Sequence, residues 1–275
     1  MHKHLYIFLY LFLLSLPIHL QNEYASKNFD TRVKYIVIHF TSQNLETSLN
    51  TFLHREENPV STHYLITDKP DDDVLNLVDE NFRAWHAGKS FWNEELNLND
   101  SSIGIEIVNT SGCNEKITAI DSYDQLKDTC NFVDFKEFQI KKLIILIKEI
   151  KERHSRIEIT NIVGHSDIAV ERKLDPGPLF PWHTLYINNV GAWYDKDDYK
   201  NFMTKFSSNL PEIKSLQLEL RKYGYKIDNS GVEDLQSQKA VRAFQMHFRP
   251  SNYDGFFDIE TAAILYALNH KYRSE

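Results

Sequence analysis

The segment GHSDIAVERKLDPGP, residues 164–178, groups several chemically active side chains within the reach of one loop. It holds His165 and Asp175, with Lys173 two positions before the aspartate. A glycine and two prolines restrict the backbone just after Asp175. The preceding stretch, residues 157–163, is rich in Ile and Val and predicts a strand that leads the chain to His165. We therefore expect a loop at the edge of a sheet, with the imidazole and the carboxylate turned into one site.

Three stretches further upstream also have the composition of strands. Residues 33–41 (VKYIVIHFT), 60–67 (VSTHYLIT) and 74–78 are short and rich in β-branched or apolar residues. The first carries His39 near its end, and the second carries His63. Strand ends are common places for ligands, although a histidine that follows four apolar residues is as readily a buried core residue.

A single carboxylate interrupts residues 101–109 (SSIGIEIVN), which are otherwise largely apolar around Glu106. Burying an isolated carboxylate is costly unless it is paired or takes part in chemistry. Glu106 is therefore a candidate functional residue. The segment AWHAG, residues 84–88, adds His86 beside Trp85 and a glycine.

Helical spacing of apolar residues appears over 45–55 and, at greater length, over 135–154. Because strands and helices are mixed along this part of the chain, we predict an α/β fold with one central sheet. Three short helical patterns follow over 211–223, 233–248 and 258–270, separated by the turn sequences KIDNSG and NYDGFFD. They predict a small three-helix domain.

The net charge of −8 comes from acidic residues that are spread along the chain. Nucleic acid is therefore not expected as a partner, since phosphate binding needs clustered Lys and Arg. The two cysteines, Cys113 and Cys130, lie in a polar, irregular segment over 110–134 and form no CxxC pair. They are either one disulfide that closes a loop in an oxidising compartment or two free thiols.

Residues 5–20 form an almost wholly apolar run that follows Lys3. The run is shorter than the roughly 20 residues that span a bilayer comfortably, and Pro17 and His19 interrupt its end. A signal peptide within residues 1–26 is the favoured interpretation, with an uncleaved N-terminal anchor or a buried first helix as alternatives.

Imidazole nitrogens and carboxylate oxygens are the ligands of zinc in hydrolases, where three protein ligands leave one position for water. An ion held by two imidazoles and one carboxylate keeps a net positive charge and lowers the pKa of bound water towards about 7. Residue type and spacing alone do not choose among the candidate ligands. They are His39, His63, His86 and His165 for the imidazoles, and Asp167 and Asp175 for the carboxylate.

Two further residues suit the hydrolysis of an amide at such a centre. Glu106 can accept a proton from the attacking water and pass it to the leaving nitrogen. Lys173 cannot ligate a metal as an ammonium group, but it can stabilise the oxyanion of a tetrahedral intermediate.

Five motifs of the first part of the chain occur together in a known family. They are HFT at 39–41, VSTHYLI at 60–66, AWHAG at 84–88, SIGIE at 102–106 and GHSDIAVERKLDPGPLFPW at 164–182. In this order they resemble the zinc-dependent N-acetylmuramoyl-L-alanine amidases, the family that includes phage T7 lysozyme-type enzymes and the peptidoglycan recognition proteins. The resemblance to the AmiD branch of that family extends over residues 33–272.

The C-terminal part also resembles this branch, which carries a helical peptidoglycan-binding domain. The matching motifs are LRKYGY at 220–225, AFQMHFRP at 243–250 and DGFFDIET at 254–261. The segment 110–134 is the least matched, which leaves the role of its cysteines open.

The resemblance implies one Zn²⁺ per chain with His39, His165 and Asp175 as ligands. It assigns Glu106 as the catalytic glutamate and Lys173 as the group that, with the zinc, stabilises the oxyanion. The implied enzyme is a zinc metallohydrolase that cleaves the amide between N-acetylmuramic acid, including its anhydro form, and L-alanine of the stem peptide. Its role would be cell-wall turnover or remodelling. The alternative is a non-catalytic protein that binds muropeptides or peptidoglycan.

Three residues fall on motif positions outside the implied metal shell. His63, Trp85 and His86 are expected to line or support the substrate cleft.

The resemblance also implies the domain organisation. We expect an amidase domain over 30–190 with a central mixed sheet flanked by helices, a linker over 191–210, and a helical peptidoglycan-binding domain over 211–272. The expected partners are peptidoglycan and muropeptides, and we expect a monomer without a protein partner. The expected location is the periplasm or cell envelope, after export, with membrane association left open.

Overall fold

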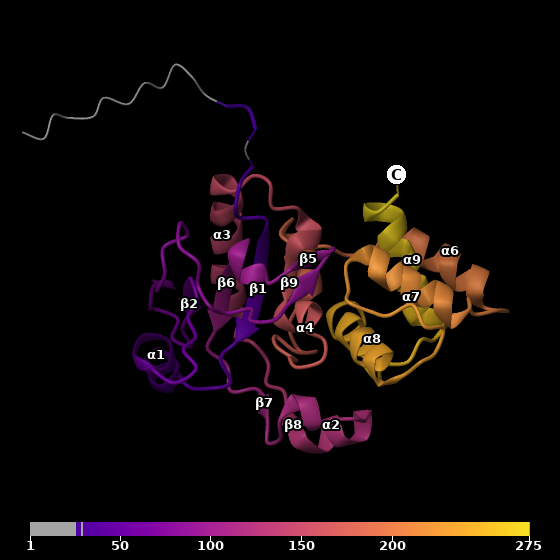
Figure 1. Ribbon diagram of the computed structural model, residues 1–275, viewed down its shortest axis with the longest axis horizontal. Helices are drawn as coiled ribbons and strands as arrows, with labels where there is room; N and C mark the ends of the chain where they lie inside the picture. Colours follow the sequence, from indigo (N-terminus) through magenta and orange to yellow (C-terminus); the bar gives the residue numbers. More distant parts are fainter. Residues whose placement is uncertain (1–25, 29, 275) are drawn as a thin grey trace, which may run out of the picture. The chain divides into compact units, whose positions relative to one another are not determined.

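The computed structural model describes residues 26–28 and 30–274 (Figure 1). Thr31–Glu275 form one compact unit, and Met1–Asp30 are a separate unit. The predicted signal peptide or anchor over residues 1–26 falls almost wholly outside the described residues. Within the described part of the chain, none of the helices combines the length and the apolarity that crossing a bilayer requires.

A five-stranded mixed sheet forms the centre of the amidase-like half, as the sequence predicts (Figure 1). Its order is β3-β2-β6-β1-β9, and all neighbours are parallel except the short edge strand β3. The strands are β1 (Tyr35–Phe40), β2 (Tyr64–Ile66), β3 (Leu75–Asn76), β6 (Ser102–Ile107) and β9 (Ile162–Gly164). Every residue of β1 and β6 is buried, which is why these strands read as nearly continuous apolar runs.

Three of the predicted strands are much shorter than expected. Of residues 74–78, only Leu75–Asn76 pair in the sheet. Of residues 60–67, only Tyr64–Ile66 pair in the sheet. Of residues 157–163, only the last two belong to β9, because a 3₁₀ turn at Ile159–Asn161 precedes it. Composition correctly predicted that these segments contain strands, but pairing in the sheet decides how far each strand extends.

One face of the sheet packs on the long helix α3 (Glu137–Arg153). Ile36 and Ile38 of β1 and Ile105 of β6 lie in this cluster, together with the apolar stripe of α3. Side chains alternate along a strand, so Tyr35 and Val37 point to the opposite face. There they join a second cluster that includes helices of the C-terminal region.

The remaining strands and α-helices of this half are short. They are α1 (Leu45–His54), the hairpin β4 (Phe91–Trp92) and β5 (Glu95–Leu96), the pair β7 (Gly112–Cys113) and β8 (Cys130–Asn131) with α2 (Tyr123–Thr129) between them, and α4 (His165–Ile168) and α5 (Trp182–Ile187). Cys113 and Cys130 face each other across β7 and β8 and form a disulfide. The segment 110–134 is therefore a closed and ordered excursion, and the free-thiol alternative is wrong.

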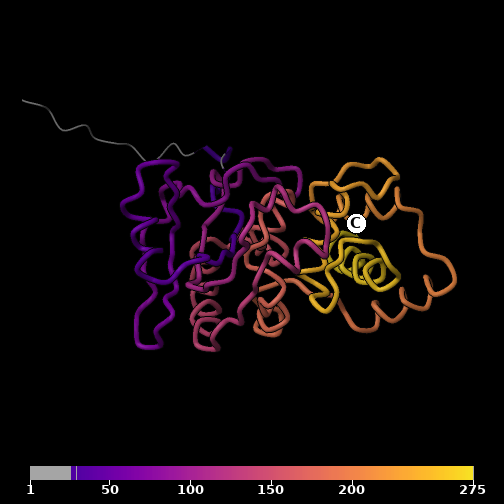
Figure 2. Tube along the Cα trace, turned by 90° about the horizontal axis from the view of Figure 1, so that it is seen from below, coloured from indigo at the N-terminus to yellow at the C-terminus, as the bar shows by residue number. Residues whose placement is uncertain are grey.

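The C-terminal region contains the three expected helices, α7 (Ile213–Tyr223), α8 (Leu235–Phe248) and α9 (Ile259–Tyr272). Asp234 and Asp258 cap the N-termini of α8 and α9, since each side chain accepts a hydrogen bond from the backbone N–H three residues on. The predicted linker over 191–210 contains a helix that the sequence analysis missed, α6 (Lys196–Phe206). Its Phe202 and Phe206 pack on Tyr266 of α9, so this segment is part of the helical layer. Figure 2 shows these helices grouped at one end of the unit.

Candidate active site

The parallel strands bring the predicted site residues to one edge of the sheet. His39 of β1 is the register partner of Glu106 of β6, so both side chains lie on the same face. Ile38 pairs with Gly164 of β9, which places His165 level with His39. Ligand sites in open α/β sheets lie outside the carboxyl ends of the strands, and these residues occupy that position.

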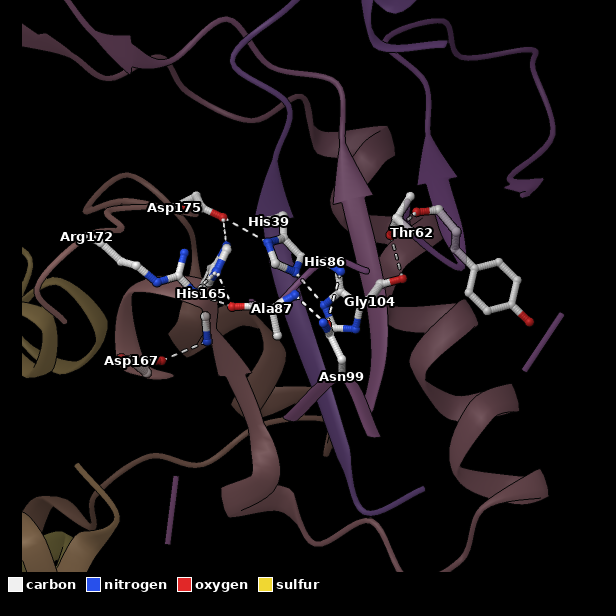
Figure 3. A network of polar contacts seen from close by, with 12 residues as sticks. His39, Thr62, His86, Ala87, Asn99, Gly104, His165, Asp167, Arg172 and Asp175 are labelled. Carbon is white, nitrogen blue, oxygen red and sulfur yellow. Dashed lines mark hydrogen bonds and ion pairs between the residues drawn. The ribbon is translucent and has the colours of Figure 1, made fainter. Parts of the chain in front are cut away.

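The loop after α4 returns Asp175 to the same place. The backbone N–H of Ser166 donates to the carbonyl of Asp175 at 2.7 Å, which joins the two ends of the loop. Oδ2 of Asp175 lies 2.9 Å from Nδ1 of His39 and 3.1 Å from Nδ1 of His165 (Figure 3). These three ligand atoms lie within 4.8 Å of one another, and all three residues are buried.

A chain of hydrogen bonds fixes which nitrogen of His39 carries its proton. The hydroxyl of Ser102 donates to the carbonyl of Leu98 at 2.5 Å, so it must accept from Nε2 of His86, 3.1 Å away. Burial lowers the pKa of His86 well below the usual value, so this ring is neutral and its Nδ1 is an acceptor. Nε2 of His39 lies 3.1 Å from that acceptor and donates to it. Burial also lowers the pKa of His39, so this ring is neutral and the lone pair of its Nδ1 points at Asp175.

His165 has a similar arrangement. Its Nε2 lies 3.1 Å from the carbonyl of Ala87, which can only accept, so this nitrogen carries the proton. Arg172 lies at 3.3 Å from the same nitrogen, but its guanidinium already donates to the carbonyls of Ala87 and Lys89, so the hydrogen bond of His165 is the shorter contact with Ala87. Burial lowers the pKa of His165 to about 3, so the ring is neutral and its Nδ1 presents a lone pair.

Two imidazole lone pairs and one carboxylate oxygen thus converge with no proton between them. These electron-rich atoms repel one another unless a cation lies between them. Both imidazoles also donate their other N–H to a protein acceptor, the usual arrangement around metal-ligating histidines. The residues present therefore fit a metal ion, and the three atoms are those that would hold it.

Glu106 shares this site but not the cluster of ligand atoms. It is 9% exposed, and its Oε2 has no hydrogen-bond partner among the described residues. Burial and the negative charge of Asp175 raise the pKa of Glu106 well above the usual value, while the charge of Lys173 opposes them. A carboxylate in this state is a strong proton acceptor.

A cavity of about 400 Å³ opens above these residues. Its walls include predicted site residues, among them Trp85, which is half exposed. Cys113 of the disulfide also lines it. Two cationic side chains that the sequence analysis did not single out, Arg55 and Lys116, also line it. Their positions could not be read from the sequence, because each lies on a segment with no motif of its own.

The four histidines of the sequence analysis have different surroundings. His86 lies beneath His39 and reaches the cavity wall. His63 is fully buried; its Nδ1 accepts from the N–H of Gly104 and its Nε2 donates to the carbonyl of Phe82. His63 thus has no free ring nitrogen for a substrate or a metal, and its contacts are those of a supporting residue.

Asp167, the competing carboxylate, is also committed elsewhere. Its two oxygens accept hydrogen bonds from the backbone N–H of Gly164, from Tyr225 and from His247. This arrangement leaves Asp175 as the carboxylate that faces the two imidazoles.

Several residues that hold the site together carry no motif that indicates such a role. Oδ1 of Asn99 accepts from the backbone N–H groups of His86 and Ala87 at 3.1 and 2.7 Å, which fixes the AWHAG segment (Figure 3). Gly104 is a glycine for a steric reason, since a Cβ there would lie 2.4 Å from Cγ of His86. The imidazole therefore occupies the space of the missing side chain, directly above β6.

Two imidazoles and a carboxylate at the ends of parallel strands, beside an unpartnered glutamate in a cleft, are typical of metal-dependent hydrolases with an α/β fold. Comparison with protein families then identifies the group. Residues 29–178 match the N-acetylmuramoyl-L-alanine amidase family, and residues 209–265 match a putative peptidoglycan binding domain. The chain belongs to the N-acetylmuramoyl-L-alanine amidases and carries a C-terminal domain of the peptidoglycan-binding type.

Individual relatives agree with this assignment. N-acetylmuramoyl-L-alanine amidase AmiD of Escherichia coli is 37% identical over 247 residues, which cover 88% of this chain and 84% of that protein. The crystal structure of AmpDh3 from Pseudomonas aeruginosa superposes with a TM-score of 0.82 at 40% identity, over 94% of this chain and all of that one. AmiD in complex with anhydro-N-acetylmuramic acid-L-Ala-D-γ-Glu-L-Lys superposes with a TM-score of 0.80 at 35% identity, over 93% of this chain and 96% of that one.

Proposed function

We propose that this chain hydrolyses the amide bond between N-acetylmuramic acid and L-alanine of the peptidoglycan stem peptide, in cell-wall turnover or remodelling. The observation that carries the proposal is the convergence of His39, His165 and Asp175 beside Glu106 at the end of the sheet. Anhydro-muropeptides are included among the substrates, because AmpDh3 has been crystallised with an anhydromuramic pentapeptide and AmiD with an anhydro-muramyl tripeptide.

The proposed cofactor is one Zn²⁺ per chain, held by Nδ1 of His39, Nδ1 of His165 and Oδ2 of Asp175. Two nitrogens and one carboxylate oxygen are a donor set that zinc prefers in hydrolases. When bound, the ion supplies Lewis acidity towards a carbonyl oxygen and towards water.

The chain's own residues would handle the protons and the charge. Glu106, basic because it is buried next to Asp175, accepts a proton from the attacking water and delivers it to the leaving nitrogen of L-alanine. Lys173 lines the same cavity, and its ammonium group stabilises the negative charge that develops on the carbonyl oxygen. His86 orients His39 through the hydrogen bond between their rings, and half-exposed Trp85 offers a wall for the sugar or the peptide.

The domain at 211–272 would hold the enzyme on its polymeric substrate and so raise the local concentration of cleavable bonds. The proposed domain bounds are 30–190 for catalysis and 191–210 for the connection, whose helix α6 packs on α9.

Export to the periplasm or cell envelope is the proposed location. The apolar run at 5–20 has the length of a signal-peptide core. The disulfide between Cys113 and Cys130 supports export independently, since such bonds persist in oxidising compartments. We propose that the chain acts as a monomer.

The test measures release of stem peptide from purified peptidoglycan and from a soluble muropeptide, before and after removal of metal by a chelator. Activity is expected to vanish on chelation and to return with zinc. The His165→Ala variant should lose both metal and activity, whereas Glu106→Gln should retain metal and lose turnover. Equal release with and without metal, or full activity of Glu106→Gln, would contradict the proposed chemistry. Binding of muropeptides without any release would favour the non-catalytic alternative.

A further inference from the structure

A buried carboxylate links residues 164–178 to the C-terminal domain. We call these residues the metal-binding loop, because they carry His165 and Asp175. Asp167 lies two positions after His165, and its side chain is inaccessible to solvent. Its Oδ2 accepts from the backbone N–H of Gly164 at 2.7 Å and from Nδ1 of His247 at 2.8 Å. Its Oδ1 accepts from the hydroxyl of Tyr225 at 2.7 Å. Two of these three donors therefore belong to the C-terminal domain.

Asp167 needs these hydrogen bonds because it is buried, and in this they differ from contacts at the protein surface. A carboxylate removed from water is strongly destabilising unless donors replace its hydration. Tyr225 is fully buried and His247 is 3% exposed, so water does not compete for either bond. Nε2 of His247 is buried without a partner among the described residues, so the ring is tied to its surroundings by the hydrogen bond from Nδ1 to Asp167.

Helix α8 also packs directly on the segment that carries the site. The ring of His247 stacks on Trp182 with 3.7 Å between centroids and an angle of 12°. Met246 shares an apolar cluster with Leu174, the residue between Lys173 and Asp175. The two ends of the metal-binding loop are thus supported by consecutive residues of one helix.

The same domain covers the face of the sheet on which the site is built. Tyr35 and Val37, which share a strand face with His39, belong to one core cluster with Leu220, Phe244 and the neighbouring C-terminal residues. Trp92 of the amidase half lies edge-on against Tyr225 at 4.9 Å. Such a continuous core differs from two domains joined by a flexible tether.

We propose that the C-terminal domain is a structural part of the catalytic site in addition to its expected role in peptidoglycan binding. Tyr225 and His247 are positioning residues that act through Asp167 on the loop of His165 and Asp175. This inference rests on the proposed function, because it concerns the geometry of the same site. It follows that turnover of a small soluble muropeptide, which needs no anchoring to the polymer, depends on this domain.

The experiment uses the full chain with single substitutions. Tyr225→Phe removes one donor and keeps the ring, and His247→Leu removes the other. His247→Asn is the rescue variant, because its amide nitrogen can take the place of Nδ1. Tyr266→Phe is the matched control, since Tyr266 belongs to the same domain but packs on Phe202 and Phe206 of α6.

Four quantities are measured: zinc affinity by competition with a chelator, kcat and KM on a soluble muropeptide, retention on insoluble peptidoglycan, and Tm. We expect Tyr225→Phe and His247→Leu to lose about tenfold in zinc affinity, at the low end of effects seen for groups that orient metal ligands. We expect kcat to fall by a similar factor with KM and peptidoglycan retention nearly unchanged. His247→Asn should recover most of the loss, and Tyr266→Phe should behave as the parent.

Zinc affinity and kcat within twofold of the parent in both variants would overturn the proposal, even if their Tm falls, since the role would then be one of stability alone. Loss of peptidoglycan retention with normal kcat would also overturn it, in favour of a simple tether. The zinc measurement is independent of catalysis. If the parent chain failed to cleave muropeptides, the proposed function would fall, while the effect of Tyr225 and His247 on the metal loop would still be decided.

Discussion

Replacement of Gly104 by alanine tests how the site is built above β6. The added methyl carbon would lie 2.4, 2.6 and 2.7 Å from three atoms of the His86 ring, where non-bonded carbons normally stay about 3.5–4.0 Å apart. The ring must therefore move by about 1 Å or more. It cannot do so freely, because His86 is buried and held by His39 on one side and Ser102 on the other.

Overpacking of this kind costs about 1–3 kcal/mol, which corresponds to a fall in Tm of about 2–12 °C for a chain of this size. Displacement of His86 also removes the acceptor for Nε2 of His39, so we expect zinc affinity to fall about tenfold or more. Gly112→Ala is the matched control, because a Cβ there would meet Ser42 only at an ordinary 3.5 Å. It should change stability by less than about 0.5 kcal/mol.

A double-mutant cycle isolates the cause. The four metal-free proteins are the parent, Gly104→Ala, His86→Ala and the double variant, compared by thermal and urea unfolding. The overlap exists only when the imidazole and the new methyl group are both present, so Gly104→Ala should cost little in the His86→Ala background. Equal costs of Gly104→Ala in both backgrounds would refute the steric explanation and the support it gives to the role of His86.

Three further predictions concern stability. Burial alone would raise the pKa of Glu80, but hydrogen bonds from Arg153 and two neighbouring side chains outweigh it and lower that pKa to about 2. The resulting contribution to the free energy of unfolding is fully present above about pH 4.5 and is lost as the pH falls towards about 2. It amounts to about 1–2 kcal/mol, because solvent at the half-exposed Arg153 screens the ion pair. Urea unfolding at about pH 6 and about pH 3 should show this loss in the parent and not in Glu80→Gln. Reduction of the Cys113–Cys130 disulfide, which closes a loop with a sequence separation of 17, should cost about 3 kcal/mol and expose the segment between the cysteines to proteolysis. Cleavage at an unchanged rate after reduction would argue against this role. Trp92→Ala should cost about 3–5 kcal/mol, because the indole is 1% exposed and packs on Tyr225. Urea unfolding of this variant should remain a single transition, since the core is continuous. Two separated transitions would contradict that continuity.

Much of the site could be predicted from the sequence, because it depends on local composition. The apolar stretch around Glu106 and the histidine at the end of 33–41 identified the two central strands. Their register then brings His39 and Glu106 side by side without any long-range information beyond parallel pairing. The choice of His39, His165 and Asp175 over the other candidates needed the family resemblance, since spacing alone did not favour them.

Features without a periodic signal could not be predicted, or were left open, from the sequence alone. Helix α6 lies in a segment of mixed composition, and packing against α9 stabilises it more than propensity does. The hydrogen-bond chain from His39 through His86 to Ser102 depends on a backbone carbonyl at its end, which no residue type reveals. The disulfide required Cys113 and Cys130 to meet across a two-stranded ladder.

The sequence by itself determined the class of fold, the family and the set of side chains available for chemistry. Hydrophobic periodicity and short motifs are local properties of the chain, so they can be identified from the sequence alone. Only the tertiary structure decided which nitrogen of each imidazole faces Asp175 and that Asp167 is committed to Tyr225 and His247. The physical reason is that hydrogen-bond direction and the pairing of a buried charge depend on groups distant in sequence, which meet only in the folded core.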